Sequence, residues 1–315
     1  MLVPSNETIQ VEGCVTMKAL LRILSVYLLV AVVLSGCGWE QDSFVYQGIL
    51  FEGFDPAKHQ PSPEFLNNVS PTKVLLSPRQ IKALKKCVDL LSENNLHYLL
   101  EYPDRFVIVK APYSFADKPQ MIVYLDMEKV NLTFSIDDDW ENKLLNANLG
   151  LMEDSGDFYF QGTPKLPNLL RILIHEIGHL VEFERLKFNW QGKFVPNPLN
   201  KEFVNISWDQ DRFWQDKEGF SQKLHNIQSI EGLLQFLQWF KEESSFFSLS
   251  SSMGMNEDFA EAFVYYILKE YYDYEISFVY QGRVVLDNLQ APNRYRQQKM
   301  AFVANLMQNE LLKNK

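Results

Sequence analysis

Apolar residues recur every three or four positions in five stretches of the chain, and this spacing predicts amphipathic helices. The first helix begins at Ser77-Pro78, because serine is a favourable N-cap and proline suits the first helical position, and it ends near Asn94. Cys87 falls on its apolar stripe, so we expect a small core residue there. The other helices are predicted at residues 167–186, 229–243 and 256–272, and in the last segment to about residue 312.

Stretches rich in Val, Ile, Tyr and Phe, bounded by Pro, Asp or Lys, predict β-strands. They lie at residues 105–110, 120–125 and 131–136, with a shorter one at 157–161. A hairpin is predicted where residues 277–280 and 283–286 flank Gln281-Gly282. The order of a helix, several strands, a helix and then mostly helices predicts an α+β fold. Its N-terminal part would hold a small mixed sheet, and its C-terminal part would be mostly helical.

Length and composition allow one large hydrophobic core, or a main domain with a smaller companion. The chain has 315 residues, of which 46% are hydrophobic and 14% aromatic. Several prolines lie among polar residues before the first predicted helix: Pro56, Pro61, Pro63 and Pro71. We therefore interpret residues 37–77 mainly as a tether, in which residues 44–54 are apolar enough to dock on the body. The folded domain is predicted at residues 78–315.

The N-terminus has the pattern of an export signal. A short basic start, Met17 to Arg22, precedes an apolar run from Ile23 to Leu34, which is too short to span a bilayer. Residues 1–36 are therefore predicted to be a signal segment. Its true start is predicted at Met17, because residues 1–16 lack these features.

The end of the apolar run, Leu34-Ser35-Gly36-Cys37, resembles the bacterial lipobox. The resemblance implies that Cys37 is lipidated, becomes the first residue of the mature chain and anchors the protein to a membrane of the bacterial cell envelope. Gly38 follows the cysteine instead of Asp, which by the same resemblance favours the outer membrane if the source is Gram-negative. An ordinary cleaved signal or a signal anchor is the alternative.

Charge and cysteine content argue against a nucleic-acid partner and against a disulfide. The formal net charge is −10 and no basic block is present, which argues against a nucleic-acid partner. The chain has three cysteines, of which Cys14 lies in the predicted signal segment and Cys37 is the predicted lipid attachment site. Only Cys87 remains, so no intramolecular disulfide is expected in the mature chain.

The strongest chemical signal is the motif H-E-x-x-H at His175-Glu176-Ile177-Gly178-His179. On a helix, two histidines four positions apart lie on one face, where both imidazoles can bind one zinc ion. Glu176 lies beside them and can accept a proton from a water molecule on the metal. The chain has only five histidines, so this spacing rarely arises by chance. A buried histidine pair and a purely structural metal are the alternatives.

A catalytic zinc site needs a third protein ligand and an open position. Downstream, Glu257 to Phe263 reads E-D-F-A-E-A-F, and Asn256 precedes it. This segment resembles the gluzincins, zinc peptidases in which a glutamate on a second helix completes the site. It is close to the thermolysin pattern N-E-x-x-x-D and matches the anthrax lethal-factor pattern E-x-F-A-E-A-F. The resemblance implies a zincin-like catalytic domain in which Glu257 binds zinc and Glu261 supports a ligand histidine through a hydrogen bond.

The segment also departs from these patterns. Position 261 is Glu where thermolysin-like enzymes have Asp, and residues 246–255 lack the tyrosine of lethal-factor-type sites. The group that stabilises the oxyanion is therefore unassigned. The candidates in the chain are His225, Tyr265, Tyr266 and Tyr295.

These features together predict a zinc metallopeptidase with one zinc ion per chain and a peptide or protein substrate. Zinc would polarise the scissile carbonyl, and Glu176 would act as the general base. We expect the substrate to lie extended along an edge strand of the N-terminal sheet, at residues 157–161. Two alternatives stay open: an envelope protein with a zincin fold that binds a partner without cleaving it, and a zinc hydrolase of a non-peptide amide or ester. The intact Glu176 argues against the first.

Overall fold

The computed structural model describes residues 40–131, 158–187, 198–208, 217–227 and 229–311. The fold is of the α+β class, with a small mixed sheet and several helices, as the sequence predicts. Cys37 and the predicted signal segment lie outside the described residues, as does the strand predicted at 131–136 apart from its first residue. In the described part of the chain, every helix is too short or too polar to cross a membrane.

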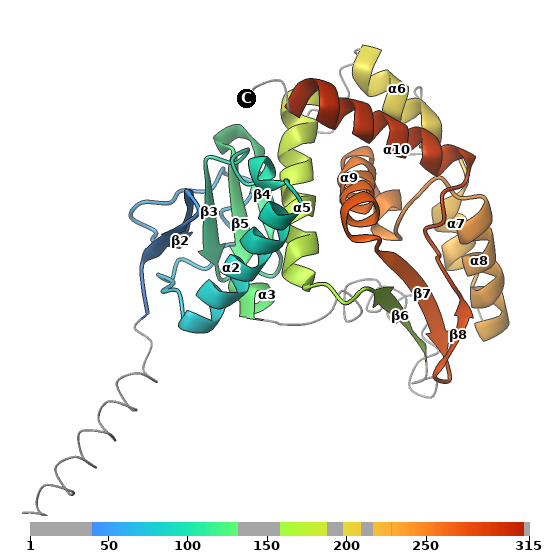
Figure 1. Ribbon diagram of the computed structural model, residues 1–315, viewed down its shortest axis with the longest axis horizontal. Helices are drawn as coiled ribbons and strands as arrows, with labels where there is room; N and C mark the ends of the chain where they lie inside the picture. The colour runs from blue at the N-terminus through green and yellow to red at the C-terminus, as the bar shows by residue number, and fades with distance from the viewer. Residues whose placement is uncertain (1–39, 132–157, 188–197, 209–216, 228, 312–315) are drawn as a thin grey trace, which may run out of the picture. The chain divides into compact units, whose positions relative to one another are not determined.

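The first sheet has five strands in the order β1-β2-β3-β5-β4 (Figure 1). Its central strands β2 (Ile49–Gly53), β3 (Arg105–Val109) and β5 (Ile122–Asp126) are parallel. The edge strands β1 (Ser43–Tyr46) and β4 (Phe115–Asp117) pair antiparallel with their neighbours. Nearly every residue of β3 and β5 is buried, as expected for parallel strands covered on both faces.

The stretch interpreted as a tether needs correction, because it contributes two strands to this sheet. β1 and β2 both lie within residues 37–77, and Val69, Val74 and Leu76 of the same stretch are buried. Phe51 of β2 is fully buried and pairs in register with Phe106 of β3. The folded unit therefore begins at Gln41 and not at residue 78.

The first predicted helix is confirmed as α2 (Pro78–Glu93). The Ser77 hydroxyl accepts a hydrogen bond from the Gln80 amide, and the Gln80 side chain accepts one from the Ser77 amide. This reciprocal pair is a capping box, which satisfies donors that the first turn leaves free. Cys87 is fully buried in the core, as predicted. Short helical segments complete this part of the fold: η1 (His97–Leu99), η2 (Lys118–Gln120) and α3 (Met127–Asn131).

A second, antiparallel sheet has the order β6-β7-β8. β6 (Phe158–Thr163) pairs with β7 (Glu275–Tyr280), which forms the predicted hairpin with β8 (Arg283–Leu286). Both turn residues, Gln281 and Gly282, have positive φ, as in a type I′ turn. The strand predicted at 157–161 exists as β6. Its placement in the N-terminal sheet was wrong, because its hydrogen-bonding partner is β7.

Helices account for most of the remaining described chain. They are α5 (Asn168–Val181), α6 (Pro198–Ser207), α7 (Phe220–His225), α8 (Ile230–Glu242), α9 (Met255–Tyr272) and α10 (Arg294–Leu306). Two π-helical turns follow α5 and α10, η4 (Glu182–Leu186) and η6 (Met307–Leu311), and a 3-10 turn, η5 (Ser250–Met253), precedes α9. The predicted helices are confirmed, whereas α6 and α7 were not predicted.

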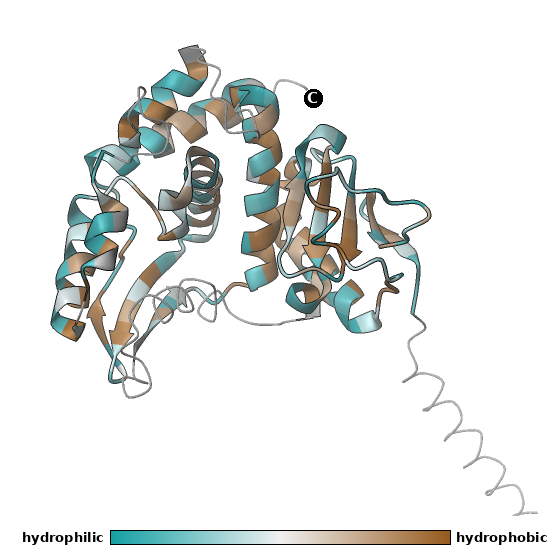
Figure 2. Cartoon of the chain, turned by 180° about the vertical axis from the view of Figure 1, so that it is seen from behind, coloured by the Kyte–Doolittle hydropathy of each residue, from teal (hydrophilic) through white to brown (hydrophobic). Residues whose placement is uncertain are grey.

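Helix α5 joins the first sheet to the helical part of the fold. It contacts α2, α3 and β4 on one side and α9 on the other (Figure 1). The view from behind shows apolar residues along α5 and on the strands beside it (Figure 2). Because α5 is covered on two sides, polar side chains on it need partners from the neighbouring elements.

Candidate metal centre

The HExxH motif occupies the C-terminal half of α5. Leu173, Ile174 and Ile177 are fully buried and fix the helix in the core. His175 and His179 lie one turn apart on the same face, with His179 buried and His175 half-buried. The two rings are nearly perpendicular, at 88° with their centres 4.7 Å apart.

Gly178 brings a second helix close to this face. A Cβ atom at Gly178 would lie only 3.3 Å from the Ala260 Cα of α9, so a side chain there would push the helices apart. The short separation lets Glu257 and Glu261, one turn apart on α9, reach the histidines of α5. The glycine in the motif therefore has a packing role.

Three side chains converge on one point between α5 and α9. The Nε2 atoms of His175 and His179 are 3.1 Å apart. Glu257 Oε2 lies 3.4 Å from Nε2 of His175, and Glu257 Oε1 lies 3.4 Å from Nε2 of His179. Asn256 donates a hydrogen bond to Glu257 Oε1 at 3.2 Å, which fixes the carboxylate. Within the described residues, this is the one group of His, Cys, Asp and Glu side chains arranged to hold a metal ion.

These separations fit a metal ion. Ligand atoms about 2.0–2.1 Å from a tetrahedral ion are about 3.4 Å from one another. Here the two Nε2 atoms are 3.1 Å apart, and each lies 3.4 Å from one oxygen of Glu257, Oε2 for His175 and Oε1 for His179. The two Nε2 atoms can form a hydrogen bond with each other only if one of the rings carries its proton at Nε2. His175, His179 and Glu257 could therefore hold a metal ion together.

Each histidine also has a carboxylate close to its Nδ1 atom. Glu261 Oε1 lies 2.8 Å from Nδ1 of His175, and Glu182 Oε2 lies 3.3 Å from Nδ1 of His179. Glu182 forms a hydrogen bond with Nδ1 of His179, and the charge of Glu261 lies close to Nδ1 of His175. Both carboxylates favour a ring proton at Nδ1, which leaves the Nε2 lone pair free for a metal. Glu261 thus lies where the sequence analysis expected a supporting group. Glu182 was missed, and its position three residues after His179 is the only signal that could have indicated it.

Each outer carboxylate is paired with a cation. Arg171 donates from one nitrogen to both oxygens of Glu261, at 2.7 and 2.8 Å. The ammonium of Lys118 contacts both oxygens of Glu182, at 3.1 and 3.3 Å. Four carboxylates and two cations then surround the site, which leaves a formal charge of −2 with neutral histidines. The carboxylates are those of Glu176, Glu182, Glu257 and Glu261. A divalent cation would balance this charge.

The pKa values show that the site attracts positive charge. Burial favours the neutral ring of His175, but Glu257 and Glu261 outweigh it and raise its pKa to about 10. Burial likewise opposes ionisation of Glu261, but Arg171 and His175 lower its pKa to about 2. The surrounding carboxylates therefore favour positive charge at the two histidines.

Glu176 is the remaining member of the motif. It is buried, with 6% of its surface exposed. Burial raises its pKa above the usual value for a glutamate, although His175 and His179 act in the opposite direction. A carboxylate in this environment is a better proton acceptor than one in water.

The three tyrosine candidates for an oxyanion-stabilising group lie on α9 and α10. Tyr265 is buried and stacks on Phe247 with ring centres 4.5 Å apart. Tyr295 lies at the start of α10, where its hydroxyl accepts a hydrogen bond from Arg294. Tyr266 is half-buried, farther along α9. The side chain of His225 lies outside the described part of the chain. No oxyanion-stabilising residue is assigned.

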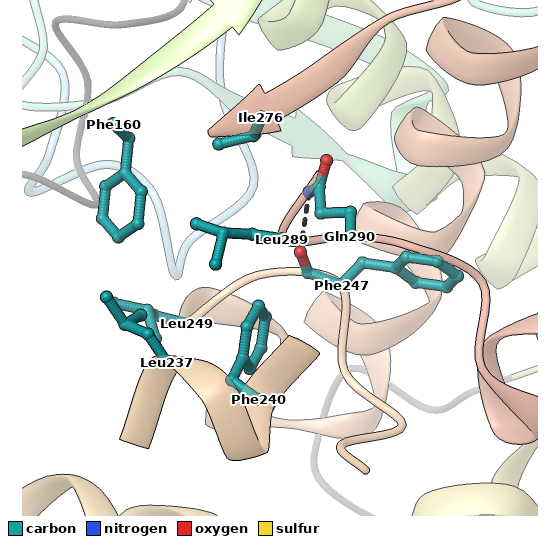
Figure 3. A pocket seen from close by; sticks show the side chains of 8 residues that line it. All are labelled: Phe160, Leu237, Phe240, Phe247, Leu249, Ile276, Leu289 and Gln290. Atoms are coloured by element: carbon teal, nitrogen blue, oxygen red, sulfur yellow. Dashed lines mark hydrogen bonds between the residues drawn. The ribbon is translucent and has the colours of Figure 1, made fainter. Parts of the chain in front are cut away.

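A small pocket lies apart from these residues, between α8, β6, β7 and the segment before α9 (Figure 3). Its volume is about 10 Å³, enough for one water molecule and too small for a peptide side chain. Its lining is apolar except for Gln290, which donates a hydrogen bond to the Phe247 carbonyl. The pocket belongs to the core and lies apart from the residues that could hold a metal ion.

No known protein family, curated protein or solved structure matches this chain. The function of the site therefore has to be inferred from its own residues.

Proposed function

We propose that this protein is a zinc-dependent metallopeptidase with a zincin-like catalytic domain. The observation that carries the proposal is the convergence of His175, His179 and Glu257. The two Nε2 atoms are 3.1 Å apart, and each lies 3.4 Å from one of the two oxygens of Glu257. Two histidines and one glutamate are the ligand set of several catalytic zinc sites, in which water or substrate takes the fourth position. Zinc bound there would polarise a scissile carbonyl and lower the pKa of a water molecule towards about 7.

Glu176 is the general base in this proposal. It follows His175 directly and lies near both histidines. Its buried carboxylate would accept a proton from the attacking water and pass it to the leaving amine. A site that only binds a partner would have no need of the Glu176 carboxylate. Its presence therefore favours a hydrolase over an envelope-binding protein.

An extended peptide would lie along an edge strand in this proposal and use main-chain hydrogen bonds. β4, the edge strand that contacts α5, has all three residues buried. β6, the edge of the second sheet, precedes α5 in the chain and is the strand that we propose for the peptide.

The proposal includes attachment of the protein to a membrane of the cell envelope. The lipobox-like sequence before Cys37 supports a lipid anchor in the bacterial cell envelope, in the outer membrane if the source is Gram-negative. The folded unit begins at Gln41, so the catalytic domain would lie only a few residues from the anchor.

The test is metal analysis of residues 38–315 together with a digest of a peptide library. We expect close to one zinc ion per chain and cleavage of a subset of peptides. A zinc-loaded protein that cleaves esters or small amides and no peptide would favour the non-peptide hydrolase. A protein that binds no zinc would contradict the proposal.

A further inference from the structure

Lys118 links the first sheet to the candidate metal centre. It is the first residue of η2 and directly follows β4. The preceding residue, Asp117, is fully buried and accepts hydrogen bonds from the amide and hydroxyl of Ser62, both at 2.7 Å. The backbone at Lys118 is therefore held in place, and its side chain, only 11% exposed, extends to α5 and η4.

Glu182 lies between Lys118 and a proposed metal ligand. It is the first residue of η4 and is fully buried. Its Oε2 atom contacts the Lys118 ammonium at 3.1 Å and Nδ1 of His179 at 3.3 Å. A single carboxylate oxygen therefore connects a lysine on the sheet edge to the imidazole.

We propose that Lys118 is a positioning residue of the metal centre, which acts on His179 through Glu182. The proposal rests on the proposed zinc site formed by His175, His179 and Glu257. A buried carboxylate needs hydrogen-bond donors for its oxygen atoms. The Lys118 ammonium donates to both oxygens of Glu182. Without it, the Glu182 carboxylate would rotate or draw in water, and the ring of His179 would lose its fixed orientation.

The two histidines are supported in different ways. Arg171, which holds Glu261 behind His175, lies on α5 itself, one turn before that histidine. Lys118 instead reaches Glu182 from an element 64 residues earlier in the chain. The orientation of His179 therefore depends on how the end of β4 packs against α5. Loss of an outer partner of a metal ligand typically lowers metal affinity about 10–100-fold.

Lys118→Met in residues 38–315 tests the inference, because it keeps the length of the side chain and removes its charge. Zinc affinity is measured by competition with a chelator, and the geometry of the site by the visible absorption of the Co²⁺-substituted protein. We expect about 10–100-fold weaker zinc binding and a changed Co²⁺ spectrum, with largely restored affinity in Lys118→Arg. Lys73→Met is the matched control, since Lys73 forms an exposed ion pair with Asp42 at 2.7 Å.

A second variant keeps the test valid if Lys118→Met does not fold. Glu182→Gln breaks the same link from the other side and should weaken zinc binding to a similar extent. If both single variants fold, the double variant should bind zinc no more weakly than the worse single one, since both remove one connection. Unchanged zinc affinity in either single variant would overturn the inference and leave the proposed function intact. A wild-type protein that binds no zinc would overturn both.

Discussion

Glu257 and His175 come from helices more than seventy residues apart in the chain, yet Glu257 Oε2 lies 3.4 Å from Nε2 of His175. Glu261, one turn later on α9, contacts the other nitrogen of the same ring at 2.8 Å. The two glutamates therefore hold the imidazole from both sides. Only Glu257 faces the point where the Nε2 atoms of both histidines meet.

Because of this difference, substitution of the two glutamates should affect zinc binding differently. Glu257→Ala removes a ligand and should yield protein that purifies nearly free of zinc. Glu261→Ala removes the partner of Nδ1 and should retain zinc with about 10–100-fold lower affinity. Metal analysis and chelator competition on both variants measure the effect. If Glu261→Ala loses zinc and Glu257→Ala keeps it, the ligand assignment is wrong by one helical turn.

Zinc binding should release protons. In the metal-free protein the pKa of His175 is raised to about 10, by Glu257 and Glu261 against the effect of burial, so its ring is charged at neutral pH. A metal ligand must be neutral at the coordinating nitrogen, so zinc competes with that proton. Affinity should rise about tenfold per pH unit between pH 6 and 8 for each proton released. Calorimetry in buffers with different ionisation enthalpies measures the release, and binding that does not depend on pH would contradict it.

Stability of the helical part should depend on a buried ion pair. Lys299 of α10 contacts both oxygens of Asp258 at 2.5 and 2.7 Å, and both residues are fully buried. Trp208 donates a third hydrogen bond to Asp258 at 3.0 Å. Lys299→Met leaves the aspartate without its cation, so the free energy of unfolding should fall by about 3–5 kcal/mol.

Urea denaturation of metal-free protein measures this loss. Lys241→Met serves as the control, because Lys241 pairs with an exposed aspartate, Asp287, at 2.6 Å. That variant should lose much less, because water screens an exposed ion pair. Equal losses in the two variants would show that burial of the Lys299 pair has no special effect.

Membrane attachment is predicted to depend on one cysteine. Cys37→Ser should abolish labelling with a radioactive fatty acid in bacteria and leave an unprocessed or mislocalised precursor. The buried Cys87 provides the control, since its replacement by serine should not affect lipidation. Full-length protein free in the cytoplasm with an intact N-terminus would contradict the anchor.

Local patterns were sufficient to predict the helices that carry the site. α5 and α9 have a clear apolar periodicity, and the spacings of His175, His179, Glu257 and Glu261 place each pair on one helical face. Two short motifs were thus sufficient to indicate the residues that could hold a metal ion.

Long-range pairing was not predictable in the same way. β1 and β2 lie in a stretch that reads as a linker, since their place in the sheet depends on β3, some fifty residues later. β6 was assigned to the wrong sheet because β7, its partner, follows more than a hundred residues later. The contact between Lys118 and Glu182 was not predictable either, because it joins residues 64 positions apart and exists only in the folded chain. Strand pairing and the contacts around the candidate ligands depend on the tertiary structure, so local sequence patterns do not reveal them.

The most direct test of the proposed peptidase is the activity of Glu176→Gln at matched zinc content. The substitution removes a proton acceptor and keeps all three proposed ligands: His175, His179 and Glu257. Zinc stoichiometry should therefore equal that of the wild-type protein, while kcat on a cleaved peptide falls about 10²–10⁴-fold. Full zinc loading with unchanged peptide cleavage in this variant would contradict the proposed mechanism.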